Sequence, residues 1–280
     1  MSTASARTPA TASTTAASTT AASTATASTS GGSAGRPLSG KAALVTGGSR
    51  GIGAAVALRL AADGADVALT YQAHADRARQ VAEQIEERGG RAWTVRAELT
   101  DARSVRQAVE GAADTFGRLD ILVNNAGTGA QGLLETVGTE ELDRVLEVNV
   151  RGAYLVAQAA AARLSEGGRI VTIGSCVASH VPFPGMTLYA MSKAAVLGLT
   201  KGLARELAPR GITVNQVDPG PVDTDMNPAD GEGAEAQAAL TLLGRYGRPE
   251  EVADSVAHLA GDGGRWITGA SLAVDGGFAA

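Results

Sequence analysis

The 280-residue sequence has one cysteine, three histidines and no long apolar run. The single cysteine, Cys176, excludes an intrachain disulfide and a thiol cluster for a metal ion. His74, His180 and His258 are scattered without the spacing of metal ligands, so we expect no metal site. No segment reaches the roughly 18 consecutive apolar residues of a membrane-spanning helix. These absences favour a cytoplasmic protein that needs no membrane.

The charge balance argues against a nucleic-acid partner. The formal net charge is −5, whereas surfaces that bind nucleic acid are basic. With 44% hydrophobic residues and only 19% charged ones, the chain can bury the core of one large α/β domain. We therefore expect a small-molecule partner.

The first part of the chain differs from the rest. Residues 1–35 are nearly all Ser, Thr, Ala and Gly and include no acidic residue, so they cannot bury enough apolar surface to fold. We predict a disordered tail over 1–37 and one folded domain over 38–280. An organelle transit peptide is the less favoured alternative, because Arg7 and Arg36 are the only bases there.

From Leu38 onward, short apolar runs alternate with stretches of helical pattern. This alternation predicts a single Rossmann-type, doubly wound parallel sheet of about seven strands with helices on both faces. A ligand is then expected at the carboxyl ends of the strands. The expected strands are 42–45, 67–69, 92–95, 121–123, 170–173, 212–214 and 271–274, and the expected helices are 52–63, 75–88, 101–116, 139–164, 189–208 and 249–260.

A glycine-rich segment, Thr46-Gly-Gly-Ser-Arg-Gly-Ile-Gly53, joins the first expected strand to the first helix. Glycines let the backbone approach a pyrophosphate, and the helix N-terminus offers free N–H groups. The simpler alternative is a tight turn without a ligand. The second strand ends without the carboxylate that holds an unphosphorylated ribose, and Arg50, His74 and Arg77 are nearby. This composition predicts a preference for NADP(H).

Tyr189 and Lys193 are four residues apart in a predicted helix and so share one face. A neighbouring ammonium favours the phenolate, so we expect Lys193, together with a bound cationic ring, to lower the pKa of Tyr189. A shift of about 3 units needs roughly 4 kcal/mol of differential stabilisation. The Asn124–Gly127 turn and Ser175 follow predicted strands, and Asn149 lies within a predicted helix. Any one of these residues has an ordinary explanation as a cap or a turn.

Taken together in this order, the motifs resemble those of the short-chain dehydrogenase/reductase family over about 38–280. The chain is similar to its 3-oxoacyl-carrier-protein-reductase-like group and to a bacterial biofilm-dispersal branch linked to cyclic-dinucleotide binding. The resemblance implies that Tyr189 exchanges a proton with a carbonyl or alcohol oxygen that Ser175 holds. It implies that Lys193 binds the nicotinamide ribose and that Asn149 anchors a water.

The same resemblance implies NADPH-dependent reduction of a ketone or aldehyde, with a 3-oxoacyl compound or a related ketone as substrate. The alternative is a regulator that binds a cyclic dinucleotide or NADP with little turnover. The family resemblance further implies a homotetramer or dimer that packs through helices 139–164 and 189–208 and through Val274–Phe278. The implied cofactor contacts are Thr46, Gly47, Ser49, Arg50, Gly51, Ile52, Gly53, Tyr71, Glu98, Leu99, Asn125, Ala126, Gly127, Tyr189, Lys193, Pro219, Gly220, Val222 and Thr224.

Two departures from the family pattern affect the site. Glu98 stands where relatives usually have Asp, which leaves its contact with the adenine open. Ser175 stands 14 residues before Tyr189, one more than is usual, so Ser179 is a less favoured alternative for the partner hydroxyl.

Residues 221–246 form a long connection that we expect to act as a lid, the alternative being a surface excursion with a helix around 235–243. The apolar side chains expected to line the substrate mouth, or else to pack beneath the lid, are Val181, Phe183, Met186 and Leu188.

Overall fold

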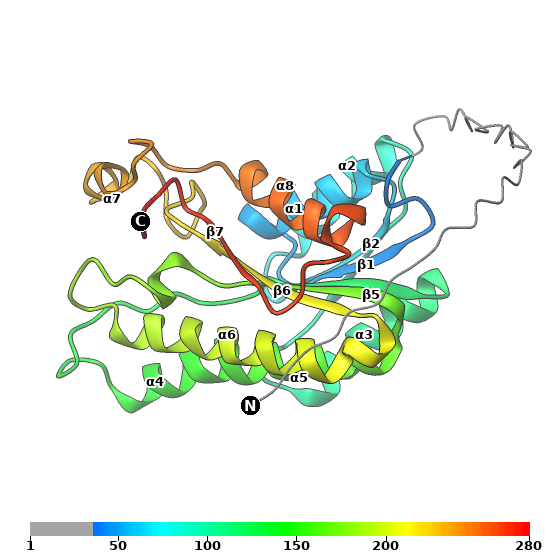
Figure 1. The fold of residues 1–280 in the computed structure, drawn as a ribbon, viewed down its shortest axis with the longest axis horizontal. Helices are drawn as coiled ribbons and strands as arrows, with labels where there is room; N and C mark the ends of the chain where they lie inside the picture. Colours follow the sequence, from blue (N-terminus) through cyan, green and yellow to red (C-terminus); the bar gives the residue numbers. More distant parts are fainter. Residues whose placement is uncertain (1–35) are drawn as a thin grey trace, which may run out of the picture. The chain divides into compact units, whose positions relative to one another are not determined.

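The computed structural model describes residues 36–280, so the predicted tail lies outside the described residues except for Arg36 and Pro37. Within 36–280, seven parallel strands form one sheet in the order β3-β2-β1-β4-β5-β6-β7 (Figure 1). This arrangement confirms the predicted doubly wound sheet. The strands are β1 Ala42–Val45, β2 Asp66–Tyr71, β3 Ala92–Arg96, β4 Leu119–Asn124, β5 Leu164–Ile173, β6 Thr213–Pro219 and β7 Ser271–Val274.

Helices cover both faces of the sheet (Figure 1). One face carries α1 Gly51–Ala62, α2 Ala75–Glu87 and α8 Pro249–Ala260. The other carries α3 Ala102–Phe116, α4 Thr139–Leu146, α5 Ala153–Arg163 and α6 Thr187–Leu207. None of the helices in residues 36–280 is long and apolar enough to cross a membrane.

The two faces follow from the alternation of side chains along each central strand. Val45 and Leu69 are buried in the core beneath α1 and α8. Their neighbours Leu44 and Ala68 point the opposite way, into the core beneath α3 and α5. Because both faces are covered, the central strands read as continuous apolar runs, which is typical of a parallel sheet.

The predicted helix over 139–164 is interrupted. The chain forms α4, then a π-helical segment over Glu147–Gly152, then α5, and Leu164 already belongs to β5. A π-helical turn is rare and often marks a functional site. Asn149 lies in this turn, where it bonds to another loop. β6 is also longer than predicted and ends at Pro219.

After β6 the chain runs through 220–248 before α8 begins. This connection contains one helix, α7 Ala234–Leu240, close to the helix expected around 235–243. Residues Val222 and Thr224 of the connection line the same cavity as the glycine loop, so the connection lies at the carboxyl ends of the strands.

Candidate active site

The glycine loop between β1 and α1 is shaped so that only glycine fits at its closest approaches. Gly47 and Gly51 have φ values of +64° and +53°, in the left-handed region that favours glycine. A Cβ placed on Gly53 would lie 2.3 Å from the Gly47 carbonyl oxygen. Thr70 at the end of β2 holds the loop, because its Oγ1 accepts from the Gly47 N–H at 3.1 Å. The loop and the helix N-terminus therefore form a cradle that suits a pyrophosphate.

The Asn124–Gly127 turn closes one wall against this cradle. Thr46 Oγ1 accepts from the N–H groups of Asn125 and Ala126 at 2.9 and 3.0 Å. Asn125 Nδ2 in turn donates to the carbonyl oxygens of Thr46 and Gly47 at 2.8 and 3.1 Å. Thr46 thus lies behind the wall and positions it.

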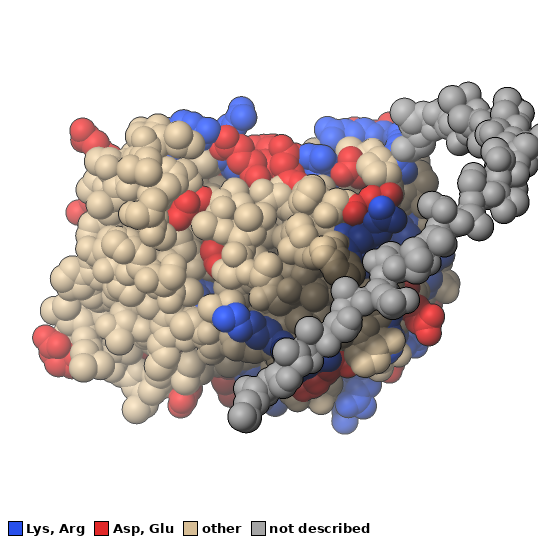
Figure 2. Space-filling model, viewed as in Figure 1, with Lys and Arg blue, Asp and Glu red and all other residues tan. Residues whose placement is uncertain are grey.

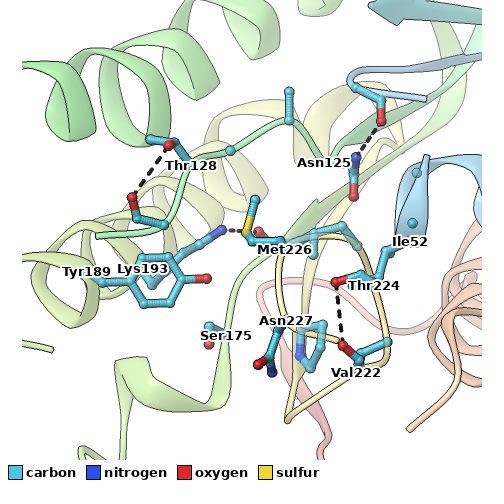
Figure 3. Close-up of a pocket in the computed structure, with 18 of the residues that line it drawn as sticks. Ile52, Asn125, Thr128, Ser175, Tyr189, Lys193, Val222, Thr224, Met226 and Asn227 are labelled. Carbon is cyan, nitrogen blue, oxygen red and sulfur yellow. Dashed lines mark hydrogen bonds between the residues drawn. The ribbon is translucent and has the colours of Figure 1, made fainter. Parts of the chain in front are cut away.

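Tyr189 and Lys193 extend from the first turns of α6 into the cavity beside Ser175 (Figure 3). Lys193 Nζ lies 5.7 Å from the centroid of the Tyr189 ring. Lys193 is buried, and its ammonium donates to the Ile173 carbonyl oxygen at 3.0 Å. The structure therefore brings the predicted pair and the predicted serine together.

The protein's own groups shift the pKa of Tyr189 upward, and the lowering predicted for Lys193 together with a bound cationic ring stays a prediction. Burial raises the pKa of Tyr189 to about 12, and a hydrogen bond from the Ser175 hydroxyl only partly opposes this rise. Burial also lowers the pKa of Lys193 to about 8, while the charge of Asp218 opposes that change. The cost of a phenolate in a poorly solvated pocket outweighs the help of the Ser175 hydrogen bond, and the Lys193 ammonium points at the Ile173 carbonyl. Near pH 7, Tyr189 therefore keeps the proton that a general acid needs.

Asn149 connects two parts of the site without lining the cavity. Its Oδ1 accepts from the Thr128 N–H at 2.8 Å, and its Nδ2 donates to the Thr128 carbonyl oxygen at 2.9 Å. Nδ2 also donates to Ser192 Oγ at 3.0 Å, and that hydroxyl donates to the Tyr189 carbonyl oxygen at 2.8 Å. The π-helical turn therefore connects the loop after β4 to α6 through buried and partly buried hydrogen bonds.

Asp218 is a residue of the site that the sequence reasoning missed. Its buried carboxylate accepts from the Ser175 N–H at 3.0 Å, from Gln216 Nε2 at 2.6 Å and from Ser271 Oγ. It holds Ser175 in place and is the acidic group whose charge acts on Lys193. A carboxylate near the carboxyl end of a buried strand, directly before Pro219, was the available signal.

Ionic side chains gather at the opposite end of the cavity. Glu98 accepts from Gln72 Nε2 at 2.7 Å and from the N–H and hydroxyl of Thr100. Burial tends to raise the pKa of Glu98, but these hydrogen bonds outweigh it and hold the pKa below its usual range. Arg50 and Arg77 both form ion pairs with Asp225.

These residues surround a cavity of about 740 Å³. Of the predicted catalytic and cofactor-contacting residues, only Thr46 and Asn149 do not line it. Among residues 36–280, no three His, Cys, Asp or Glu side chains come together as metal ligands. The predicted residues that line the cavity are Gly47, Ser49, Arg50, Gly51, Ile52, Gly53, Tyr71, Glu98, Leu99, Asn125, Ala126, Gly127, Ser175, Tyr189, Lys193, Pro219, Gly220, Val222 and Thr224.

The substrate mouth differs in part from the prediction. Phe183 and Met186 line it, but Val181 is exposed and Leu188 is a buried residue of α6, and neither lines the cavity. Phe278 from the C-terminal segment lines the mouth instead. Ser175 lines the cavity, whereas Ser179 is exposed and its hydroxyl donates to the Cys176 carbonyl oxygen at 3.0 Å.

Comparisons with known proteins agree with this geometry. A family described as enoyl-(acyl carrier protein) reductase matches residues 47–279. The cyclic-di-GMP-binding biofilm dispersal mediator protein of Escherichia coli is 43% identical over 242 residues, which cover 86% of this chain and 98% of that protein. The 3-oxoacyl-[acyl-carrier-protein] reductase FabG of Staphylococcus aureus is 40% identical over 241 residues, or 85% and 98% of the two chains.

A solved structure is also similar. The short-chain dehydrogenase from Burkholderia cenocepacia, crystallised in complex with NADP, is 55% identical and superposes with a TM-score of 0.86. The match covers 87% of this chain and all of that one. With the family match over 47–279 and with relatives covered almost in full, the chain belongs to the short-chain dehydrogenase/reductase family of oxidoreductases.

Proposed function

We propose that this protein uses NADPH to reduce a ketone or aldehyde to an alcohol, and that it catalyses the reverse reaction with NADP⁺. The observation that supports this most directly is the arrangement at the reaction end of the cavity. Tyr189, protonated near neutral pH, and the Ser175 hydroxyl enter the same cavity as the glycine cradle. A proton donor and a nucleotide cradle in one cavity suit hydride transfer to a carbonyl.

The side chains divide the work as follows. Tyr189 Oη gives its proton to the substrate oxygen, and the Ser175 hydroxyl donates a hydrogen bond to that oxygen. Lys193 holds the ribose next to the reacting ring and adds positive charge beside Tyr189. Asn149 orders the Thr128 backbone and α6 around the proton path. The nicotinamide, when bound, supplies the hydride.

Several residues support NADP(H) as the cofactor. β2 ends in Thr70 and Tyr71, so the end of this strand lacks the carboxylate that usually holds an unphosphorylated ribose. Arg50 lines the cavity at this end, and a guanidinium suits a phosphate. The Burkholderia relative was crystallised with NADP. We therefore propose that Arg50 and Arg77 receive the 2′-phosphate.

The substrate is proposed to be a 3-oxoacyl compound or a related ketone. Phe183, Met186, Met226 and Phe278 give the mouth of the cavity an apolar lining, which suits a carbonyl on a hydrophobic chain. The relative named as a 3-oxoacyl reductase supports the same substrate class.

The test is NADPH oxidation with a panel of ketones, aldehydes and 3-oxoacyl thioesters, followed at 340 nm. The Tyr189→Phe variant should lose turnover by about 100- to 10,000-fold, the usual contribution of a general acid. It should still bind NADPH, as measured by nucleotide fluorescence. Tyr154→Phe, which removes the same hydroxyl from an exposed tyrosine on α5, is the matched control and should retain turnover. Full activity in Tyr189→Phe would contradict the proposed function.

A second function is favoured by one relative, whose name describes cyclic-di-GMP binding and biofilm dispersal. In that case the protein would be a nucleotide-binding regulator with little turnover. Calorimetric titration with cyclic di-GMP, with and without saturating NADPH, separates the two. Tight binding of the cyclic dinucleotide together with no turnover on any carbonyl supports the regulator.

We also propose a homotetramer or dimer, as the family resemblance implies. Figure 2 shows few charged residues on the face over β7 and α7, and Leu240, Leu242 and Leu272 are exposed large apolar side chains of these segments. Burying them against a second copy would remove apolar surface from water. Sedimentation at micromolar concentration tests this, and a monomeric mass overturns it. The cytoplasmic location stays a prediction.

A further inference from the structure

Asp225 makes an unusual contact between the connection after β6 and the glycine loop. Its Oδ2 accepts from Arg50 at 3.4 Å and also from Arg77. Arg50 directly precedes α1, and Arg77 lies in the first turn of α2. One carboxylate of the connection therefore pairs with two guanidinium groups from two elements of the nucleotide-binding half.

The carboxylate is carried on a short turn that lies against the cradle. The backbones of Thr224 and Asn227 are paired in both directions, at 3.3 and 3.0 Å. The Thr224 side chain lies 3.2 Å from where a Cβ on Gly51 would be. Met226, between these two residues, lines the cavity (Figure 3). A change in the hydrogen-bond partners of Asp225 would therefore move residues that line the cavity.

The pairing of two guanidinium groups with one anion resembles a phosphate-binding site. Two guanidinium groups around one anion match the oxygens of a phosphate, and a dianion pairs with two cations better than a single carboxylate does. All three side chains are about half exposed, so an incoming ligand can reach them. With a phosphate present, the Asp225 carboxylate would be repelled by a like charge.

We propose that Asp225 is an internal stand-in for the 2′-phosphate of NADP(H), which displaces it and so releases the 221–228 segment from the arginines. The inference rests on the proposed function, because it takes Arg50 and Arg77 as the 2′-phosphate site. A nucleotide without this phosphate leaves the contact in place. Asp225 thereby limits the affinity for NADPH and couples the identity of the cofactor to the position of the lid.

The test compares Asp225→Asn with Asp230→Asn, a matched control that removes the same charge from an exposed aspartate of the same connection. Nucleotide fluorescence measures the Kd of NADPH and of NADH, and calorimetry measures those of 2′,5′-ADP and 5′-AMP. Asp225→Asn should bind NADPH and 2′,5′-ADP about three- to fivefold more tightly, because exposed ion pairs contribute up to about that factor. Binding of NADH and 5′-AMP should not change, and Asp230→Asn should match the wild type.

Amide hydrogen exchange gives a second, independent result. In the wild type, saturating 2′,5′-ADP should speed exchange over residues 224–227, whereas 5′-AMP should not. In Asp225→Asn this segment should exchange fast with either nucleotide. Equal protection by the two nucleotides in the wild type contradicts the displacement.

The outcomes distinguish a failure of the proposed function from a failure of the displacement of Asp225. If the wild type binds NADPH no better than NADH, the cofactor part of the proposed function fails and this inference fails with it. If the wild type prefers NADPH but Asp225→Asn leaves the ratio of the two Kd values unchanged, only the displacement is overturned. A gain in affinity for both nucleotides alike also overturns it, because it would place the effect away from the 2′-phosphate.

Discussion

The two ends of the cavity hold their charges in different ways. At the reaction end, Lys193 and Asp218 are buried, and each is hydrogen-bonded to backbone or to neutral side chains. At the end that holds the proposed 2′-phosphate site, Arg50, Arg77 and Asp225 are exposed, and each arginine pairs with Asp225. The first arrangement fixes groups that must be in place before the reaction, and the second can exchange partners when a ligand arrives.

The physical reason lies in solvation. A buried charged group that loses a hydrogen-bond partner cannot replace it with water, so the loss lowers the free energy of unfolding by about 1.5–3 kcal/mol. An exposed ion pair competes with water and salt at all times and contributes about 0.2–1 kcal/mol. The same charged residue types should therefore respond very differently to mutation at the two ends.

After the loss expected for Tyr189→Phe, the largest expected effect concerns the serine at the reaction end. Ser175→Ala should lower kcat by about 100- to 1,000-fold, the usual effect of removing one donor to a developing oxyanion. The KM for NADPH should stay near that of the wild type. Ser179→Ala is the control, because its hydroxyl bonds to the Cys176 backbone outside the cavity. A large loss in Ser179→Ala with little loss in Ser175→Ala would reverse the assignment of the two serines.

The next effect is a pH dependence of stability caused by Lys193. Its pKa is about 8 in the folded protein against 10.5 for the free side chain, so between these values only the unfolded chain binds the proton. The stability of the wild type relative to Lys193→Met should therefore rise as the pH increases from 7 to 10, by about 2–3 kcal/mol. Urea unfolding of both proteins measures it.

Tyr189 and Cys176 have raised pKa values and titrate above this range in both proteins, so they largely cancel in the difference. Parallel pH curves for the wild type and Lys193→Met would show that Lys193 is not buried as a charged group.

Much of the fold was predictable because its signals are local. For example, Leu44 and Val45 point into two different cores, and the uninterrupted apolar run that contains them predicts a strand buried on both faces. The glycine loop was predictable too, since the strand and helix that flank it adjoin it in sequence. The cavity then brought together residues that the family resemblance had implied, from Gly47 to Thr224.

Other features depend on contacts between distant segments. Asn149 in the π-helical turn bonds to Thr128, 21 positions away in the sequence, and no local pattern in 139–164 predicts the turn. The direction of the pKa shift of Tyr189 depends on how dry the pocket is, which spacing alone does not reveal. The pairing of Asp225 with Arg77 joins residues 148 positions apart.

The Asp218→Asn variant tests how much a buried charge at the reaction end contributes to the free energy of unfolding. The variant keeps the size of the side chain but removes the charge from three hydrogen bonds and from the neighbourhood of Lys193. We expect the free energy of unfolding to fall by about 2 kcal/mol. Urea unfolding at pH 7 measures it, with Asp230→Asn as the control for net charge. A change as small as that of the control would mean that Asp218 is not a structural part of the site.

Arg77→Ala applies the same measurement to the exposed end and carries the smallest expected effect. It removes one guanidinium from Asp225, which keeps Arg50 as a partner. The free energy of unfolding should change by less than about 1 kcal/mol, and the change should shrink further in 0.5 M NaCl because exposed pairs are screened. A loss as large as that of Asp218→Asn, unaffected by salt, would contradict the comparison, because the arginine pair would then be part of the folded framework and could not exchange one anion for another.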